Sequence, residues 1–246
     1  NKASKTGVTQ PTPLPLSSKF DMSHTHTAFV TMCDRDPKTG ACRMDGASAV
    51  LCTPKCPPNV AYTYVDNSTG IVDPYLTLAT EFGWANYMFQ TNQGPSFPAH
   101  QFLFGGTAAP SAADDAAGIF AAENPTKSGN PVGDSAGCAA PAGITVQLID
   151  PNGSEKQTMF PCFEHMTMVD LLPSTFTWKY YAPNPGSIWT APNAIQHICK
   201  STGVGGTCKG KEWVDNVDLN PADLLKDIAS CNLRSLSWVT PTGQNS

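Results

Sequence analysis

A serine and a histidine lie four residues apart in a segment whose other residues restrict the backbone. Ser96 follows a Gly-Pro turn, and Pro98 stands at an early helical position, where the missing N–H of proline is harmless. The segment ends on two consecutive glycines, which are a helix stop signal. The pattern predicts a helix that begins at or beside Ser96, with His100 one turn further along on the same face.

A hydroxyl at the start of a helix could act on an anion. The first turn of a helix presents unpaired N–H groups and the positive end of the helix dipole, which suit a phosphoryl group. Ser96 could therefore be a nucleophile, although serine is also among the commonest N-cap residues and could serve only to close the helix. A serine-hydrolase elbow fits worse, because that motif needs glycine two residues after the nucleophile and this chain has Pro98 there.

Two further histidines, His24 and His26, occupy alternate positions after Asp21. If that segment is extended, both side chains share one face and could form a polar site. Each histidine also has a structural alternative. His26 could be a hydrogen-bonded neighbour of His24, and His100 could pack its helix against a sheet.

The elements that must position these residues alternate between strands and helices, which favours an α/β fold with a mainly parallel sheet. An apolar run at residues 84–89 predicts a buried strand directly before Ser96. Further strands are expected at 144–149, 177–181 and 236–239, and helices at 73–82, 166–172, 193–198 and 220–229.

Three details of this assignment can be tested. The helix at 220–229 is expected to bury Leu224, Leu225 and Ile228. Residues 107–141, with Asp114-Asp115 among small and polar residues, are expected to form a solvated loop without a metal. Loops after strand ends commonly build the site in such folds, so Tyr180, Tyr181 and Trp189 could line it, although packing in the core or at its rim is favoured for each.

Five short runs spread over nearly the whole chain carry a resemblance to a known family. They are DMSH (21–24), MDG (44–46), YLTLA (75–79), GPSFPAH (94–100) and SIWTAP (187–192). In this order they resemble the bacterial phosphoesterase family of non-zinc phospholipases C and related acid phosphatases. The resemblance is specific for the family and less so for the substrate.

The resemblance implies an alkaline-phosphatase-like three-layer α/β sandwich that hydrolyses phosphate mono- or diesters. Ser96 would be the nucleophile and one ligand of a divalent metal ion, which activates the hydroxyl. His24 would contact a phosphate oxygen or assist the leaving group. His100, His26 and Trp189 would bind the substrate, with phospholipids as one candidate.

The acidic metal-binding motifs that family members carry at both ends do not occur in this sequence. We therefore expect residues 1–246 to be a single incomplete phosphoesterase domain. Residues 1–70 would form a loop-rich, Cys-rich part and residues 71–246 the α/β portion. We expect most metal ligands to lie outside this fragment, and the fragment alone to be poorly active.

Composition excludes several classes of protein. The 246 residues include 40% hydrophobic and only 14% charged residues, with a net charge of -5. The chain therefore has no basic patch for nucleic acid, and no apolar run approaches the length of a transmembrane helix.

Nine cysteines are many for a reducing compartment and favour a secreted or periplasmic protein. A zinc site is the competing interpretation, but no two cysteines have the two-residue spacing of a zinc knuckle. The pairs favoured by spacing are Cys33 with Cys42, Cys52 with Cys56 and Cys199 with Cys208, with Cys138 and Cys162 as a fourth plausible bridge and Cys231 left over. The alternative function is a secreted, disulfide-braced binding or scaffold module without catalysis.

Overall fold

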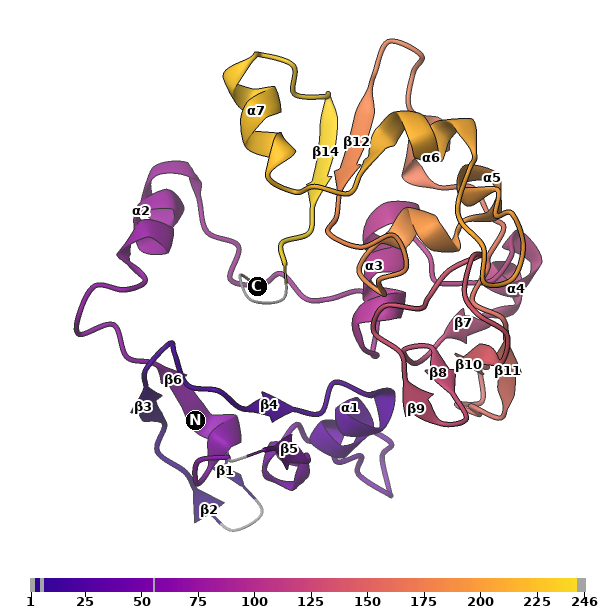
Figure 1. The fold of residues 1–246 in the computed structure, drawn as a ribbon. Coiled ribbons are helices and arrows are strands. Elements are labelled where there is room, and N and C mark those ends of the chain that lie inside the picture. Colours follow the sequence, from indigo (N-terminus) through magenta and orange to yellow (C-terminus); the bar gives the residue numbers. More distant parts are fainter. Residues whose placement is uncertain (1–2, 5–6, 55, 243–246) are drawn as a thin grey trace. The chain divides into compact units, whose positions relative to one another are not determined.

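The computed structural model describes residues 3–4, 7–54 and 56–242, which belong to two compact units (Figure 1). The first unit spans residues 1–90 and the second residues 91–246. The boundary between the two units, after residue 90, lies 20 residues beyond the boundary at residue 70 that the sequence predicts between the Cys-rich part and the α/β portion. The assignment of all 246 residues to one incomplete domain stays a prediction.

The first unit consists of short elements joined by loops. Its strands pair two by two: β1 with β2 and β4 with β5 are antiparallel, and β3 with β6 is parallel. The elements in order are β1 (Ala3–Ser4), β2 (Gly7–Val8), β3 (Thr12–Leu14), β4 (Asp21–Met22), α1 (His26–Cys33), η1 (Ala47–Ala49), β5 (Cys52–Thr53), η2 (Val60–Tyr62), β6 (Thr63–Val65) and α2 (Asp73–Phe82).

The predicted disulfides are confirmed in both units. The first unit contains Cys33–Cys42 and Cys52–Cys56, and the second contains Cys138–Cys162 and Cys199–Cys208. Cys231 is a free, exposed thiol, as expected.

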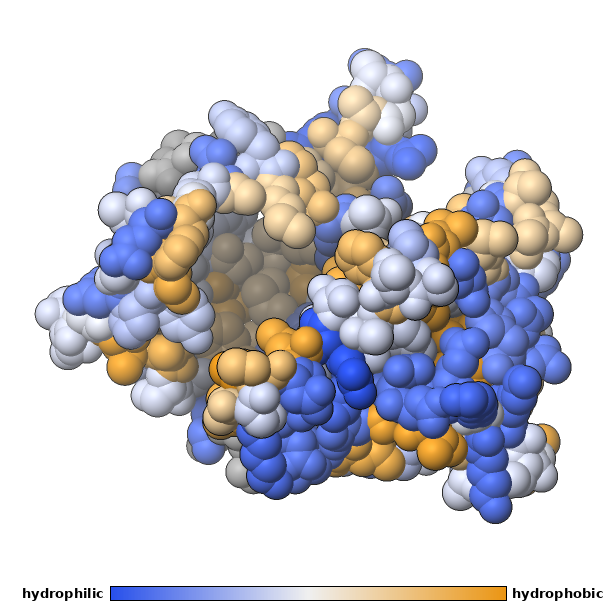
Figure 2. Space-filling view, turned by 90° about the horizontal axis from the view of Figure 1, so that it is seen from above, coloured by the Kyte–Doolittle hydropathy of each residue, from blue (hydrophilic) through white to orange (hydrophobic). Residues whose placement is uncertain are grey.

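Helix α2 has the predicted limits, but the strand expected after it is absent. Asp73 and Pro74 begin α2, and Gly83 ends it. Residues 84–89 form no strand, and their large side chains are exposed, Phe89 by 80%. The apolar composition of this run was therefore misleading: it did not lead to burial in the sheet. Apolar side chains are also visible among polar ones in the space-filling view (Figure 2).

The second unit contains an antiparallel sheet and a parallel sheet. In the antiparallel sheet, β10 pairs with β11, β7 and β8, and β8 also pairs with β9. The elements in order are α3 (Ser96–Gly105), α4 (Ala112–Ala117), β7 (Phe120–Ala121), β8 (Thr126–Lys127), β9 (Asn130–Pro131), β10 (Ile144–Ile149), β11 (Gln157–Met159), η3 (Met168–Leu171), β12 (Trp178–Tyr181), η4 (Ala191–Ala194), α5 (Gln196–Cys199), α6 (Lys211–Asn216), β13 (Val217–Asp218), α7 (Asp223–Ala229) and β14 (Leu236–Val239).

The parallel sheet has the strand order β13-β12-β14, and it positions helix α3. Successive side chains of a strand point to opposite faces. Trp178 and Tyr180 face α3, where both rings pack edge-on against Phe104. Phe104 is fully buried, so the apolar side of α3 is anchored on this sheet.

The opposite face of β12 is polar and holds helix α7. Lys179 Nζ lies 2.9 Å from a carboxylate oxygen of Asp218 on β13 and 2.9 Å from one of Asp227 on α7. The Tyr181 hydroxyl donates to the same Asp227 oxygen at 2.6 Å. Alternation along a single strand thus gives one face to an aromatic core and the other to an ionic network.

Several expectations are corrected. The sheet is not mainly parallel: among the described strands, most pairings are antiparallel. Leu225 and Ile228 are exposed, because helix α7 contacts the parallel sheet through the ion pair between Asp227 and Lys179 and not through these apolar side chains. Residues 107–141 are not a plain loop: α4 forms there with Ser111 as N-cap, and its Asp114 accepts from the Ser111 hydroxyl. The fold is thus a mixed α/β arrangement of small parallel and antiparallel sheets.

The helices expected at 166–172 and 193–198 are shorter than predicted. Only η3 forms in the first range, and in the second the 3₁₀ turn η4 and helix α5 are separated at Ile195. The strand at Ile144–Ile149 and the one at Leu236–Val239 have the predicted limits, and β12 differs by one residue.

Candidate active site at the start of helix α3

A tight turn presents the first residue of α3. Pro95 is the N-cap, with φ -79°, and Ser96 is the first helical residue. Gly94 is required by a close approach, because a Cβ there would lie 2.4 Å from the carbonyl oxygen of Ala122. The Asn92 side chain donates to the Gly94 carbonyl at 2.9 Å and closes the turn. The turn is therefore held from both sides before the helix begins.

The Ser96 hydroxyl does not cap the helix. It makes no hydrogen bond with any residue that the structure describes, and its side chain is half-buried. The cap comes instead from Asn124, whose Oδ1 accepts from the Phe97 N–H at 2.8 Å. The capping alternative for Ser96 is thus not what this geometry shows, and the hydroxyl is available for chemistry.

Few unpaired donors remain at this end of helix α3. The Phe97 N–H bonds Asn124, Pro98 has no N–H, and the Ala99 N–H donates to the Pro95 carbonyl at 3.2 Å. The Ser96 N–H and the Asn124 side-chain NH₂ have no partner among the described residues. Both could donate to an anionic oxygen bound beside the Ser96 hydroxyl.

His100 is joined to Trp189 through Tyr180. The Tyr180 hydroxyl donates to the Trp189 carbonyl at 2.6 Å, and His100 Nδ1 lies 3.3 Å from the Tyr180 oxygen. Since the single phenol proton is given to Trp189, His100 must donate from Nδ1, which leaves a lone pair on Nε2. Two residues predicted to bind substrate, His100 and Trp189, therefore belong to one hydrogen-bonded chain.

Burial fixes the protonation of this chain. It lowers the pKa of His100 below the ordinary 6.5 and raises the pKa of Tyr180 above the ordinary 10.0. Near neutral pH, His100 is thus an uncharged imidazole and Tyr180 a phenol. An uncharged imidazole with a free Nε2 lone pair is a proton acceptor, one helical turn from the Ser96 hydroxyl.

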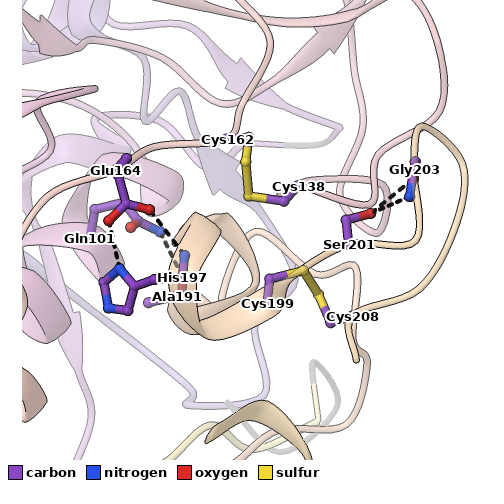
Figure 3. The surroundings of a disulfide bond; sticks show 10 residues. All are labelled: Gln101, Cys138, Cys162, Glu164, Ala191, His197, Cys199, Ser201, Gly203 and Cys208. Atoms are coloured by element: carbon purple, nitrogen blue, oxygen red, sulfur yellow. Dashed lines mark hydrogen bonds and ion pairs between the residues drawn. A yellow bond between two sulfur atoms is a disulfide. The ribbon is translucent and has the colours of Figure 1, made fainter. Parts of the chain in front are cut away.

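Helix α3 is also fastened to the loop that carries Trp189. The Gln101 side-chain NH₂ donates to the Ala191 carbonyl at 3.2 Å, a bond drawn in Figure 3. Phe97, one residue after the candidate nucleophile, is fully buried edge-on against Phe163. The position of Ser96 is therefore set by packing of its own helix.

The other two predicted histidines lie in the first unit, in a different local structure from the one expected. Thr25 caps α1 by accepting from the Ala28 N–H at 3.1 Å, so the segment is helical from His26 onward. His26 is buried, while His24 is exposed with Nε2 3.0 Å from Asp21 Oδ1. The extended segment with both side chains on one face was thus wrong. The roles of His24 and His26 in substrate chemistry stay predictions.

The described residues do not provide a ready metal centre. No group of three or more His, Cys, Asp or Glu side chains in that part of the chain is arranged to hold an ion. Asp114 and Asp115 are bonded within the α4 region, to Ser111 and Thr107 respectively. The divalent metal and the role of Ser96 as its ligand stay predictions.

A family model for the phosphoesterase family matches residues 54–246, which is most of the chain. The chain belongs to the phosphoesterase family. The comparisons with curated proteins and with solved structures returned no match. Membership supports hydrolysis of phosphate esters in general, and the match contains the whole segment from Gly94 to His100.

The disulfides and the lengths of the helices bear on the location of this protein. Its four disulfides are typical of proteins from oxidising compartments. In the part of the chain that the structure describes, no helix has the length and hydrophobicity that a transmembrane span requires.

Sequence reasoning missed one residue of the candidate site and left another without a definite role. Asn124 is 27 positions from Phe97, and nothing in its sequence context marks it as the cap of α3. Tyr180 was considered as a lining residue, but its hydrogen bonds to a histidine 80 positions away and to Trp189 depend on the fold.

Proposed function

We propose that this phosphoesterase hydrolyses phosphate mono- or diesters with the Ser96 Oγ as nucleophile. The observation that carries the proposal is the state of this hydroxyl: it is half-buried at the first residue of a helix, has no partner among the described residues, and leaves the capping to Asn124. The alternative, a disulfide-braced binding or scaffold module, requires Ser96 only to cap or pack. The Ser96 geometry argues against that alternative.

In the proposed reaction, the Ser96 Oγ attacks phosphorus and forms a phosphoserine while the bond from phosphorus to the leaving-group oxygen breaks. Water then attacks phosphorus, the bond to Oγ breaks, and the Ser96 hydroxyl is restored with release of phosphate or a phosphomonoester. The Ser96 N–H and the Asn124 NH₂ support this scheme because they can donate to the non-bridging oxygens.

His100 Nε2 is the proton acceptor in this proposal. Its lone pair disfavours direct contact with an anionic oxygen, but it can take the proton of the Ser96 hydroxyl or of the attacking water. This refines the substrate-binding role that the sequence predicts for His100. The proposal keeps the roles that the family resemblance implies for the other residues: His24 would contact a phosphate oxygen or assist the leaving group, and His26 and Trp189 would bind the substrate.

The proposal also includes a divalent metal with Ser96 as one ligand, as the family resemblance implies. The described residues supply no cluster of further ligands. An alkaline-phosphatase-like three-layer sandwich is the proposed fold. It is supported by the parallel sheet β13-β12-β14, which has α3 on one face and α7 on the other.

The test is hydrolysis of p-nitrophenyl phosphate and of phosphocholine esters by Ser96→Ala, with Ser174→Ala as the matched control. Ser174 is exposed in a turn and makes no hydrogen bond with the described residues. We expect Ser96→Ala to lower the rate more than about a thousandfold while Ser174→Ala changes nothing. Since the expected turnover is low, a second measurement does not depend on the rate: mass spectrometry after acid quenching should detect a phosphoserine at Ser96. An undiminished rate in Ser96→Ala would remove this residue from the mechanism.

Phospholipids are one candidate substrate and the periplasm or the extracellular space the proposed location. Vesicles of phosphatidylcholine distinguish a phospholipase C from a phosphatase, because only the former releases diacylglycerol and phosphocholine.

A further inference from the structure

A pocket, which we call the Trp213 pocket, lies in the second unit at the carboxyl ends of β12 and β13. Its volume is about 390 Å³, and four stretches of chain line it: 134–141, 184–186, 205–208 and the α6–β13 region around Trp213 and Leu219. The volume is within the range of small-molecule sites, and ligands of α/β proteins commonly bind beyond the carboxyl ends of parallel strands. No residue of α3 lines this pocket.

The walls of the Trp213 pocket are fastened to one another. The Ala136 N–H donates to the Gly186 carbonyl at 2.7 Å, and the Gly205 N–H donates to the Ala140 carbonyl at 2.9 Å. The Cys199–Cys208 disulfide, seen in Figure 3, ties the third wall to α5. A Cβ at Gly186 would lie 2.6 Å from the Asp134 carbonyl oxygen, so this approach admits only glycine without a shift. The pocket is therefore preformed.

Trp213 brings an unused donor to this pocket. Trp213 is only 7% exposed, and its indole N–H makes no hydrogen bond with any residue that the structure describes. The Nε1 atom is not closed off from solvent, so it can donate to a bound molecule. Because Trp213 lines the pocket, a ligand oxygen there could accept this bond.

Other polar groups around the pocket are also available. Asp134 and Ser135 have no side-chain partner among the described residues. The Asn184 Oδ1 accepts from the Gly186 N–H at 2.8 Å, which leaves its NH₂ group to donate elsewhere. The remaining lining is largely apolar, from Trp213, Pro141 and Leu219. A ligand would thus meet an apolar surface together with both donors and acceptors.

The charge of the lining decides the class of ligand. No Lys, Arg or His lines the pocket, so nothing there neutralises a phosphate. A quaternary ammonium would be attracted by the Asp134 carboxylate but would leave the Trp213 N–H without an acceptor. A neutral molecule with several hydroxyl groups satisfies both, because a hydroxyl oxygen accepts from Trp213 and a hydroxyl hydrogen is donated to Asp134.

We propose that the Trp213 pocket binds a neutral polyhydroxylated ring, such as a monosaccharide or a cyclitol. One face of the ring lies on the apolar lining, and its hydroxyls bond the Trp213 N–H, the Asp134 carboxylate and the Asn184 amide. This binding does not depend on hydrolysis at Ser96, so a failure of either proposal leaves the other standing.

The test is titration of the ¹⁵N-labelled chain with D-glucose, D-galactose, D-mannose and myo-inositol, and with choline and inorganic phosphate for contrast. The chain has five tryptophans, and the indole N–H signal of Trp213 is identified by its loss in Trp213→Phe. We expect at least one neutral ring to shift this signal saturably below about 50 mM, while the signal of Trp84 stays in place. Absence of such a shift for all four rings, or a saturable shift with choline or phosphate alone, overturns the proposal.

Two variants test the contacts. Trp213→Phe keeps an aromatic ring but removes the donor, and Asp134→Asn changes an exposed residue on which no described contact depends. We expect each to weaken binding of the ring about tenfold, measured by calorimetry. The control is Trp84→Phe, which alters an exposed tryptophan of the first unit and should bind as the unmodified chain does. If Trp213→Phe folds and both pocket variants bind with unchanged affinity, the assignment is wrong.

Discussion

Helices α2 and α3 have the same length, ten residues, and similar local signals. Each has a proline in its first turn and ends at a glycine, Gly83 or Gly106. An asparagine from outside each helix supports its start: Asn67 accepts from the Val72 N–H beside α2, and Asn124 accepts from the first turn of α3.

The two helices differ in burial. No residue of α2 is buried, whereas α3 buries Phe97, Pro98, Gln101 and Phe104. Local signals thus determine where a helix begins and ends, while tertiary packing determines whether it can hold a side chain in place. The candidate nucleophile lies on the helix whose position is held by packing.

The largest effect expected from this difference concerns core substitutions. Phe104→Ala on α3 removes a fully buried ring that packs against Trp178 and Trp238, and should lower the free energy of unfolding by about 3–5 kcal/mol. Leu78→Ala on α2 removes a side chain that is 55% exposed, and should change it by no more than about 0.5 kcal/mol. Urea unfolding followed by aromatic circular dichroism measures both. Equal losses would mean that α2 is also packed in solution.

The units can next be compared through their disulfides. Cys138–Cys162 in the second unit closes a loop with a sequence separation of 24, and Cys52–Cys56 in the first unit closes one of 4. If a disulfide stabilises by reducing the entropy of the unfolded chain, removing Cys138–Cys162 should lower the free energy of unfolding by about 1.5 kcal/mol more than removing Cys52–Cys56. The measurement is thermal unfolding of the two double Cys→Ala variants. A larger loss for the Cys52/Cys56 variant would show that the first unit depends more on its bridge than loop length implies.

Much of the local structure could be predicted from the sequence. The limits of α2 and α3 follow from proline and glycine, and three of the four disulfides follow the close spacing of their cysteines. Both kinds of signal act over short sequence distances. The strand β10 was also predicted, from a run at 144–149 that ends in an Asp-Pro-Asn-Gly turn, and the structure buries it on alternate positions.

Burial and long-range contacts could not be predicted. Residues 84–89 have the composition of a buried strand, but hydrophobicity alone does not supply a partner strand. Thr25 turned the expected extended His24–His26 segment into a helix start, because its hydroxyl found the Ala28 N–H. Asn124 and Tyr180 reach α3 only through the tertiary fold, so no spacing rule could have identified their contacts.

A smaller effect is expected from replacing the asparagines that support the starts of the two helices, Asn124 for α3 and Asn67 for α2. Asn124→Ala should leave the Phe97 N–H without its cap, cost about 1 kcal/mol of stability, and slow hydrolysis because the side-chain NH₂ beside Ser96 is lost. Asn67→Ala should have a similar effect on stability at the start of α2 and leave the rate unchanged. Unfolding curves and rates on p-nitrophenyl phosphate separate these outcomes. If Asn67→Ala slowed hydrolysis as much as Asn124→Ala, the special role of Asn124 would be excluded.

The smallest expected effect is a change in the pH dependence of stability and of the hydrolysis rate, caused by His100 on α3. Helix α2 contains no histidine. Burial lowers the pKa of His100 below 6.5, so the folded protein resists protonation that the unfolded chain accepts. Stability is therefore complete above pH 6.5 and falls as the pH drops below that value, because protons then favour the unfolded state. If His100 Nε2 accepts the Ser96 proton, kcat/KM should likewise be maintained down to a pH below 6.5 and decline when the imidazole becomes charged. His100→Gln should flatten the stability profile in this range and abolish the acidic decline in rate. A purely packing role for His100 would flatten the stability profile but leave the rate profile in place, so the pair of measurements distinguishes a proton acceptor from a core histidine.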